Sequence, residues 1–286
     1  MNQLTTLSCE FFPPRSPEAI ARLERVSAQL ATLRPDFFSV TFGAGGSTQD
    51  LTLDTVMKLH AATGIEAAPH LSCIGTPIAE LREILQQYVA AKVRRLVVLR
   101  GDMPSGMTGF GEFRFASELV AFVRQETGRA FHIEVAAYPE FHPQATSASQ
   151  DLKNFKRKVV AGADSAITQY FFNPDAYFRF IDSCQALQIE IPIVPGIMPI
   201  LNFTQLARFS EMCGAEIPRW VMKRLQDFGD DRDAIRRFGI DVTTELCRRL
   251  VEQGVPGLHF YTMNQYEATM TICRDLGLDT AACQGN

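Results

Sequence analysis

The stretch that decides the fold class is residues 67–99, AAPHLSCIGTPIAELREILQQYVAAKVRRLVVL. It begins with the apolar run Ala67–Leu71 and ends with a second run, Leu96–Leu99. Short, continuously apolar runs are typical of strands buried on both faces of a parallel sheet. Between them, Thr76-Pro77 combines an N-cap residue with a proline suited to the first helical turn, and Leu81–Val89 follows it. The stretch therefore predicts one strand–helix–strand unit.

The same unit recurs along the chain. Six further strands are predicted at Leu7–Phe11, Phe37–Thr41, Ile133–Ala137, Ala166–Gln169, Ile191–Val194 and Leu258–Tyr261. Other helix starts are expected at Ser16-Pro17, Asp151, Asn173-Pro174, Asn202 and Asp230. Eight strand-then-helix units predict an α/β fold, a closed (β/α)8 TIM barrel that forms one domain over residues 1–286, with an open doubly wound sheet as the alternative. Residues 217–254 hold more helix than one unit needs, so we expect an extra helix before the last strand.

Composition narrows the class of protein. Of 286 residues, 46% are hydrophobic and 21% charged, which favours a large core over disorder. A net charge of −4 argues against nucleic acid or an anionic membrane as the main partner. The longest apolar run, Ile191–Leu201, has 11 residues and three prolines, too short for a membrane span. Residues 1–12 contain no basic residue and no small-residue cleavage site, so a secretory signal is not expected.

Several chemistries are disfavoured by what the sequence lacks. The seven cysteines form no Cys-x-x-Cys pair and are odd in number, which predicts reduced thiols in the cytoplasm. The five histidines show no ligand spacing, so no metal site is predicted. No Gly-x-Ser-x-Gly elbow occurs and no lysine ends a predicted strand, which disfavours a serine hydrolase and a Schiff-base aldolase.

Chemistry in such a barrel lies at the carboxyl ends of the strands. Those ends combine polar groups with large aromatic residues, which suits a flat, partly polar cofactor or heterocycle. Glu10 is followed by Phe11-Phe12 and two prolines, so we expect burial to raise the pKa of its carboxyl group. A neutral acid near pH 7 could then give a proton to a substrate. The alternative is a carboxylate that binds loop amides.

Two predicted strands are each followed by a segment that contains glycine, and each of these segments has two interpretations. Asp102 follows Gly101 after the fourth predicted strand and either lies near a ligand or faces water in a turn. Residues 43–46, Gly-Ala-Gly-Gly, either hold phosphates or form a tight loop. Thr48 stands where a G-x-G-x-x-G fingerprint needs its third glycine, so a Rossmann dinucleotide site is not predicted.

A charged helical face follows His142. Asp151, Asn154 and Lys158 recur at helical spacing, with Arg157 beside them. These side chains could bind the pyrophosphate, ribose and adenine of a dinucleotide. A solvated charged face is the alternative.

Nine motifs occur in chain order: EFFPPR (10–15), SVTFGAGGST (39–48), APHL (68–71), LRGDMP (99–104), AYPE (137–140), DLKNFKRK (151–158), ITQYFF (167–172), PGIMP (195–199) and HFYTMN (259–264). From about Glu10 to Leu276 the chain closely resembles the bacterial methylenetetrahydrofolate reductases. The resemblance implies an FAD-bound (β/α)8 barrel that reduces 5,10-methylenetetrahydrofolate to 5-methyltetrahydrofolate with NADH or NADPH. The implied partner is a folate substrate, with neither nucleic acid nor membrane, and a homo-oligomer is expected.

The resemblance also implies residue roles. Glu10 resembles the general acid that opens the five-membered ring, and Asp102 the catalytic residue beside flavin and pterin. The implied folate contacts are Asp102, Gln169, Gln205, Phe209, Tyr261 and the residue at Gln265, and Thr41 is implied near the nicotinamide. The implied FAD-binding set is Phe42, Ala44, His70, Arg100, Gly101, Asp102, Ala116, Tyr138, His142, Ala145, Asp151, Asn154, Arg157 and Lys158.

One position departs from the family pattern. After Asn264 the family carries an arginine that contacts folate, where this chain has Gln265. Glutamine keeps a hydrogen bond but lacks the fixed cation, which predicts weaker folate binding or a substitute cation from a neighbouring loop.

Three rival functions stay open: a pterin-binding methyltransferase barrel without flavin, a binding protein that has lost turnover, and a flavin-independent reductase.

Overall fold

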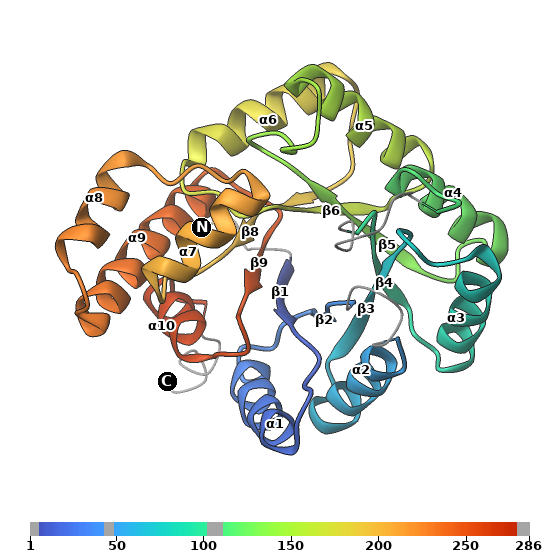
Figure 1. Ribbon diagram of the computed structural model, residues 1–286, viewed down its shortest axis with the longest axis horizontal. Coiled ribbons are helices and arrows are strands. Elements are labelled where there is room, and N and C mark those ends of the chain that lie inside the picture. Colours follow the sequence, from blue (N-terminus) through green and yellow to red (C-terminus); the bar gives the residue numbers. More distant parts are fainter. Residues whose placement is uncertain (1–5, 43–48, 102–110, 279–286) are drawn as a thin grey trace, which may run out of the picture.

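Parallel strands curl into one barrel with helices around it (Figure 1). The computed structural model describes residues 6–42, 49–101 and 111–278. The strands are β1 (Thr6–Phe11), β2 (Phe37–Val40), β3 (Glu66–Ser72), β4 (Arg95–Leu99), β5 (His132–Ala137), β6 (Ser165–Thr168), β7 (Ile193–Val194), β8 (Gly196–Ile197) and β9 (Gly257–Tyr261). They are hydrogen-bonded in the order β7-β6-β5-β4-β3-β2-β1-β9-β8.

The two shortest strands close the barrel. Only Pro195 separates β7 from β8, and β7 pairs with β6 while β8 pairs with β9. Proline has no N–H to donate to a ladder, but its carbonyl accepts a hydrogen bond from the backbone of His259 at 3.0 Å. The pair is therefore one interrupted strand, and the predicted barrel of eight strands is confirmed. The strand predicted at Ile191–Val194 begins two residues later, at Ile193.

Ten helices lie within the described residues: α1 (Pro17–Ala31), α2 (Gln49–Thr63), α3 (Ile78–Ala90), α4 (Ala116–Thr127), α5 (Ala148–Val160), α6 (Pro174–Ala186), α7 (Phe203–Cys213), α8 (Arg219–Asp227), α9 (Arg232–Glu252) and α10 (Glu267–Asp275). Three of them, α7 to α9, stand between β8 and β9, so the predicted extra helix is confirmed. None of the helices in the described ranges is long and apolar enough to cross a membrane.

Side-chain caps explain three of the predicted helix starts. Ser16, Asn173 and Asn202 each accept a hydrogen bond from a backbone N–H in the first turn of α1, α6 and α7. Such a bond satisfies a donor that has no partner inside the helix.

The other three predicted starts were misplaced. Helix α5 begins at Ala148 because Ser147 provides the cap, so Asp151 lies in its first turn. Helix α9 begins after Asp231, one residue beyond the predicted Asp230. Helix α3 begins at Ile78, with Pro77 rather than Thr76 at the cap position. The backbone N–H of Ile78 donates to Glu112 Oε2 at 2.5 Å, so a distant carboxylate replaces the expected local cap.

Alternation along the strands divides the core in two. The buried residues Leu7, Cys9 and Phe11 of β1 pack in the large cluster beneath the helices, whereas Ser8 and Glu10 face the barrel interior. At the amino end of the barrel the interior is closed by a polar network. There Arg95 pairs with Glu134, with Nη1 and Oε1 2.5 Å apart. The carboxyl end is where space remains.

Gly239 sets how closely α9 can approach the chain after β8. A Cβ at this position would lie 2.0 Å from the carbonyl oxygen of Ile200. Alanine favours a helix over glycine by up to about 1 kcal/mol, but overpacking costs about 1–3 kcal/mol, so packing should win. We expect Gly239→Ala to lower the free energy of unfolding measured with urea, and Arg237→Ala, at an exposed position on the same helix, to change it little. A Gly239→Ala protein as stable as the wild type would contradict this packing.

Candidate active site

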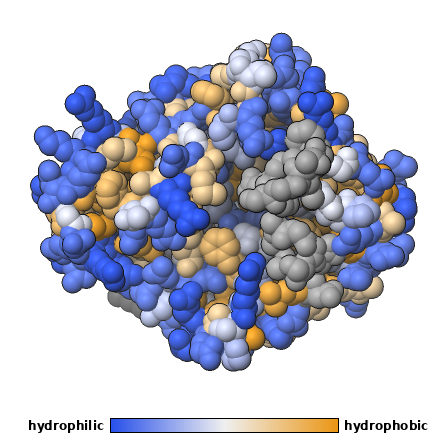
Figure 2. Space-filling model, in the orientation of Figure 1, coloured by the Kyte–Doolittle hydropathy of each residue, from blue (hydrophilic) through white to orange (hydrophobic). Residues whose placement is uncertain are grey.

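A cavity of about 550 Å³ opens at the carboxyl ends of the strands. In Figure 2 the surface is hollowed near its centre, over the barrel that Figure 1 shows in the same orientation. The walls come from strands on opposite sides of the barrel and from α7. Among the lining residues are Glu10, Thr41, Phe42, His70, Gly101, Tyr138, His142, Gln169, Phe209, His259 and Tyr261.

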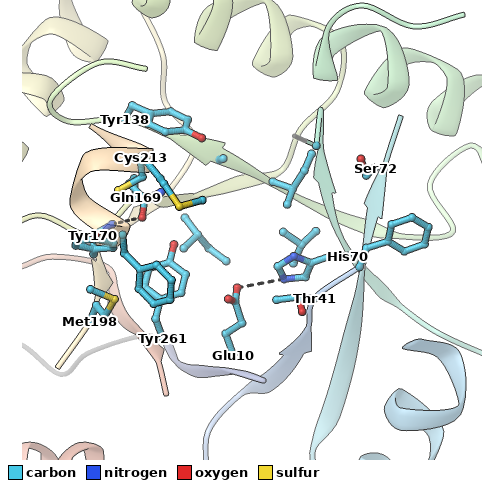
Figure 3. A pocket seen from close by; sticks show the side chains of 18 of the residues that line it. Glu10, Thr41, His70, Ser72, Tyr138, Gln169, Tyr170, Met198, Cys213 and Tyr261 are labelled. Carbon is cyan, nitrogen blue, oxygen red and sulfur yellow. Dashed lines mark hydrogen bonds and ion pairs between the residues drawn. The ribbon is translucent and has the colours of Figure 1, made fainter. Parts of the chain in front are cut away.

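Glu10 lies on the floor of this cavity between two histidines. Its Oε2 is 3.3 Å from Nε2 of His70 on β3 and 3.8 Å from Nε2 of His259 on β9. Figure 3 shows the Glu10 side chain directed into the pocket, with its contact to His70 dashed. The Glu10 side chain keeps 14% of its surface accessible, so a ligand in the cavity can touch it.

These histidines reverse the expected protonation of Glu10. Burial alone raises the pKa of a carboxyl group, but interactions with His259 and His70 outweigh it and lower the pKa to about 2. The predicted rise in the pKa was wrong because Phe11 points to the opposite face of β1, into the outer core. Glu10 is therefore a carboxylate at neutral pH.

The loops after β1 and β9 are fastened to each other around Glu10. Thr262 Oγ1 donates to the Glu10 carbonyl oxygen at 2.6 Å. The Asn264 side chain accepts from the backbone N–H of Phe12 at 2.8 Å and donates to its carbonyl oxygen at 3.0 Å. These bonds fix where the carboxylate stands. Sequence reasoning assigned no role to Thr262, Asn264 or His259, although they lie in the HFYTMN motif.

The opposite wall of the cavity holds Gln169 and Tyr261. Gln169 Oε1 accepts a hydrogen bond from the Tyr170 backbone at 2.9 Å. Tyr261 donates its hydroxyl to the Thr168 carbonyl oxygen at 2.7 Å. Gly196 makes this contact possible, since a Cβ there would lie 2.1 Å from the Thr168 carbonyl oxygen and 2.6 Å from the Tyr261 ring. Figure 3 places Gln169 and Tyr261 across the pocket from His70.

A second cavity of about 250 Å³ continues the first toward α4 and α5. Both cavities share the lining residues Leu99, Gly101, Ala136, Tyr138, His142 and Gln144, so they form one elongated hollow. The second is lined by most of the predicted cofactor set: Arg100, Gly101, Ala116, Tyr138, His142, Ala145, Asp151, Asn154 and Lys158.

The chemistry of the second cavity is cationic and rich in hydrogen-bonding groups. The Nζ atom of Lys158 donates to the Ala136 carbonyl oxygen at 2.5 Å, and desolvation lowers the pKa of this lysine to about 8. Asp151 accepts from the backbone N–H of His142 at 2.9 Å, and this bond fixes the turn before α5. A bound anion would relieve the desolvation cost of the buried ammonium group. The residues present therefore fit a dinucleotide pyrophosphate.

His142 and Gly101 shape the passage between the two cavities. His142 Nδ1 accepts a hydrogen bond from the Gln144 backbone at 3.0 Å, and its ring packs on Tyr138 with ring centroids 4.6 Å apart. Gly101 has φ +88° and a Cβ there would lie 1.9 Å from Ser72 Oγ. Both the backbone angle and the space exclude a side chain at this turn.

Three predicted site residues lie away from this hollow. Arg157 is exposed and lines a groove between α4 and α5 on the outer side. Gln205 is exposed in the first turn of α7, one turn before the lining residue Phe209. Gln265 follows the lining residue Met263 by two positions. Ala44 and Asp102 lie outside the described residues.

Gln265 has a cationic neighbour. Arg236 on α9 donates a hydrogen bond from Nη2 to Gln265 Oε1 at 3.2 Å. A cationic side chain therefore lies beside Gln265, on a helix rather than on a neighbouring loop, and its role toward folate stays a prediction. Within the described ranges, no group of three His, Cys, Asp or Glu side chains could hold a metal ion.

The lowered pKa of Glu10 has a testable consequence for stability. A carboxyl group with a lower pKa in the folded state stabilises the protein above its unfolded pKa of about 4.5 and loses this effect as the pH falls toward 2. We expect the free energy of unfolding of the wild type to fall toward that of Glu10→Gln as the pH drops from 6 toward 3, by urea titration. Glu24→Gln, at an exposed position on α1, controls for charge. A difference that grows on acidification would show a raised pKa instead.

Several known proteins are similar to this chain over most of its length. The sequence model of the family described as methylenetetrahydrofolate reductase matches residues 1–277. The 5,10-methylenetetrahydrofolate reductase of Escherichia coli (strain K12) is 42% identical over 272 residues, which cover 95% of this chain and 90% of that protein. The enzyme of the same name from Buchnera aphidicola subsp. Schizaphis graminum is 38% identical over 278 residues, covering 97% and 94%.

Two more distant proteins extend the comparison. Methylenetetrahydrofolate reductase (NADH) 1 of Zea mays is 36% identical over 287 residues, which cover 96% of this chain and 48% of the plant protein. A solved structure from Clostridium thermocellum, of a protein described as binding two copies of 5-methyl-5,6,7,8-tetrahydrofolic acid, has a TM-score of 0.66 at 16% identity. That structure, matched over 96% of both chains, shows likeness of fold. From the family match and the bacterial identities, the chain belongs to the methylenetetrahydrofolate reductase family.

Proposed function

We propose that this protein reduces 5,10-methylenetetrahydrofolate to 5-methyltetrahydrofolate, with FAD as bound cofactor and NADH or NADPH as reductant. The observation that carries the proposal is the continuous hollow, which joins Glu10 and Gln169 at one end to Lys158 at the other. A reactive carboxyl group and an anion-binding end thus face one elongated space. This arrangement suits a dinucleotide whose flat ring reaches the floor of the barrel.

The donor set of the second cavity supports FAD as the occupant. Lys158 and Arg100 supply positive charge for a pyrophosphate, while Asp151 and Asn154 supply oxygen atoms suited to ribose hydroxyls or an adenine amino group. A bound flavin would supply hydride transfer, taking reducing equivalents from the nicotinamide and giving them to the folate. In the first cavity, Thr41 and Tyr261 line the space beside Glu10 where each substrate would stand in turn.

One cavity for two flat substrates favours a ping-pong sequence. The lining of the 550 Å³ cavity is common to whatever enters, so nicotinamide and folate would alternate there. Glu10 is placed to give a proton to the leaving nitrogen of the imidazolidine ring, while Gln169 can hydrogen-bond a pterin edge. Proton donation by Glu10 requires a proton to reach the carboxylate when the folate is bound.

The absorbance spectrum of the purified protein tests the proposal. We expect a yellow protein whose flavin absorbance is lost on adding NADH or NADPH without folate and returns on adding methylenetetrahydrofolate. Comparing the loss of flavin absorbance with NADH and with NADPH under the same conditions identifies the reductant. A colourless protein that transfers methyl groups would favour the methyltransferase alternative, and a yellow protein without turnover the binding protein. Folate reduction without flavin would favour the flavin-independent reductase.

Glu10→Gln separates the two halves of the reaction. The variant should still lose its yellow colour with the nicotinamide, because that half needs no acid at Glu10. Reoxidation by methylenetetrahydrofolate should slow by roughly 10²-fold or more, since a positioned acid contributes about that much. Stopped-flow absorbance at the flavin band measures both halves. Normal turnover by Glu10→Gln would exclude the acid role.

The folate tail provides a further prediction. Its glutamate carboxylates need a cation, and we propose that Arg236, held by Gln265, provides it. Arg236→Gln should weaken folate binding about 10- to 150-fold, which corresponds to the ~1.5–3 kcal/mol of one hydrogen bond to a charged group, without changing the nicotinamide half-reaction. Arg237→Gln, at an exposed position of α9, is the matched control. If Arg236 already binds the folate carboxylates, Gln265→Arg should raise the affinity for folate only slightly. A large rise in affinity in Gln265→Arg, together with unchanged affinity in Arg236→Gln, would refute this role of Arg236.

A further inference from the structure

Tyr170 links two walls of the first cavity. It lies two residues after the end of β6, and its hydroxyl oxygen is 3.1 Å from Ser210 Oγ on α7. Its backbone N–H donates to Gln169 Oε1 at 2.9 Å (Figure 3). The Tyr170 side chain lines the cavity and is 5% exposed. One residue therefore holds the Gln169 side chain through its backbone and α7 through its hydroxyl group.

Helix α7 has few buried residues with which to fix its position. Only Leu206 and Ser210 of its 11 residues are buried, whereas α6 buries five of 13. Leu206 packs in the apolar cluster around α7 and α8, while Ser210 bonds to Tyr170. Where an element has few buried contacts, each contact has a larger effect on its position. The bond between Ser210 and Tyr170 should therefore control where α7 lies against the barrel.

Both partners of this bond stand next to an expected folate contact. Tyr170 directly follows Gln169, and Ser210 directly follows Phe209. Gln169 and Phe209 both line the cavity, one from the barrel and one from α7. Because adjacent residues share a rigid peptide unit, holding Ser210 against Tyr170 also fixes the span between Gln169 and Phe209.

We propose that Tyr170 is a positioning residue that sets the width of the folate site through its hydrogen bond to Ser210. The inference rests on the proposed function and adds to it what holds Phe209 at its distance from Gln169. A flat heterocycle binds more tightly between two contacts whose spacing is already fixed, because less conformational freedom is lost on binding.

The Tyr170 hydroxyl group is suited to this role because it stays protonated. Burial raises the pKa of Tyr170, and the neighbouring Cys213 thiol raises it further, against a smaller opposite effect of Ser210. The hydroxyl group can therefore donate to α7 at neutral pH. Cys213 lies three positions after Ser210, so the two face the tyrosine from neighbouring turns of one helix face.

The two ends of α7 are held by other bonds. Asn202 caps its first turn by accepting from the backbone N–H of Gln205 at 2.9 Å. Beyond its last turn, the backbone N–H of Glu216 donates to Glu140 Oε2 at 2.8 Å. Loss of the Tyr170 bond should therefore leave α7 folded and let its middle, which carries Phe209, shift relative to the barrel.

Two variants break the bond from either side. Tyr170→Phe keeps the ring and removes the hydroxyl group, and Ser210→Ala removes the other partner. Isothermal titration calorimetry of the flavin-loaded protein with 5-methyltetrahydrofolate measures affinity without turnover. We expect each variant to bind about 2- to 10-fold more weakly, which corresponds to one neutral hydrogen bond. The double variant should bind no more weakly than Tyr170→Phe, because the same bond can be lost only once.

The kinetics should separate positioning from chemistry. In stopped-flow reoxidation, the methylenetetrahydrofolate concentration that gives half the maximal rate should rise in Tyr170→Phe, while the rate at saturation changes less, since Glu10 is unaltered. Flavin reduction by the nicotinamide should change by a smaller factor than folate binding. Thr41, near which the nicotinamide is expected, lies across the pocket from Tyr170 (Figure 3).

Tyr177→Phe is the matched control. Tyr177 is buried and donates its hydroxyl group to the Ile193 carbonyl oxygen at 2.7 Å, but it lies on α6 and does not line the cavity. Removing this hydroxyl group is expected to lower stability and to leave folate affinity at the wild-type value. Should Tyr170→Phe fail to fold, the comparison of Ser210→Ala with this control decides.

Three results would overturn the proposal. The first is wild-type folate affinity in Tyr170→Phe and Ser210→Ala, and the second is additive losses in the double variant. The third is equal weakening of folate and nicotinamide binding, which would indicate a general loosening of the cavity. A wild-type protein that binds no 5-methyltetrahydrofolate, or that holds no flavin, would instead contradict the proposed function.

Discussion

A carboxylate buried inside a β-barrel needs compensation, and the floor of this site is built around that requirement. Glu10 leaves water for the barrel interior, where an isolated charge is costly. His259 provides part of the compensation from β9, which is next to β1, and His70 provides the rest from β3, which lies beyond β2. Their contacts are long, at 3.3 and 3.8 Å, so Glu10 is stabilised as an anion without being locked in place. A reacting group needs both properties.

The barrel contains a second glutamate–histidine pair, and the contrast explains where chemistry can occur. Near the amino end, Glu134 binds Arg95, Ser165 and His132 and is 3% exposed, so its oxygens are occupied. Saturated contacts of this kind fill the barrel and fix its strands. Near the carboxyl end, Glu10 faces open space and has fewer partners. The same pair of residue types thus serves structure at one end and a candidate reaction at the other.

The helices between β8 and β9 complete the site from above. Helix α7 brings Phe209, Met212 and Cys213 to the cavity wall, and α9 brings Arg236 to Gln265. Because residue 239 is glycine, α9 can pack directly against the backbone at Ile200, and this contact sets how close α9 lies to the chain after β8. The extra helical segment therefore lines the first cavity, whereas the second cavity lies across the barrel at α4 and α5.

The sequence by itself determined the eight strands and the barrel, because continuous apolar runs and local caps such as Ser16 act over short distances. It also determined the family and most residues of the elongated hollow, since eight of the nine motifs fall at strand ends that must meet and the ninth, DLKNFKRK, lies on α5. Only the tertiary structure decided the protonation of Glu10. Alternation turned Phe11 away, and closure of the barrel brought His259, 249 positions later, beside the carboxylate. Such a neighbour leaves no trace in local sequence, and for the same reason the pairing of Arg236 with Gln265 could not be foreseen.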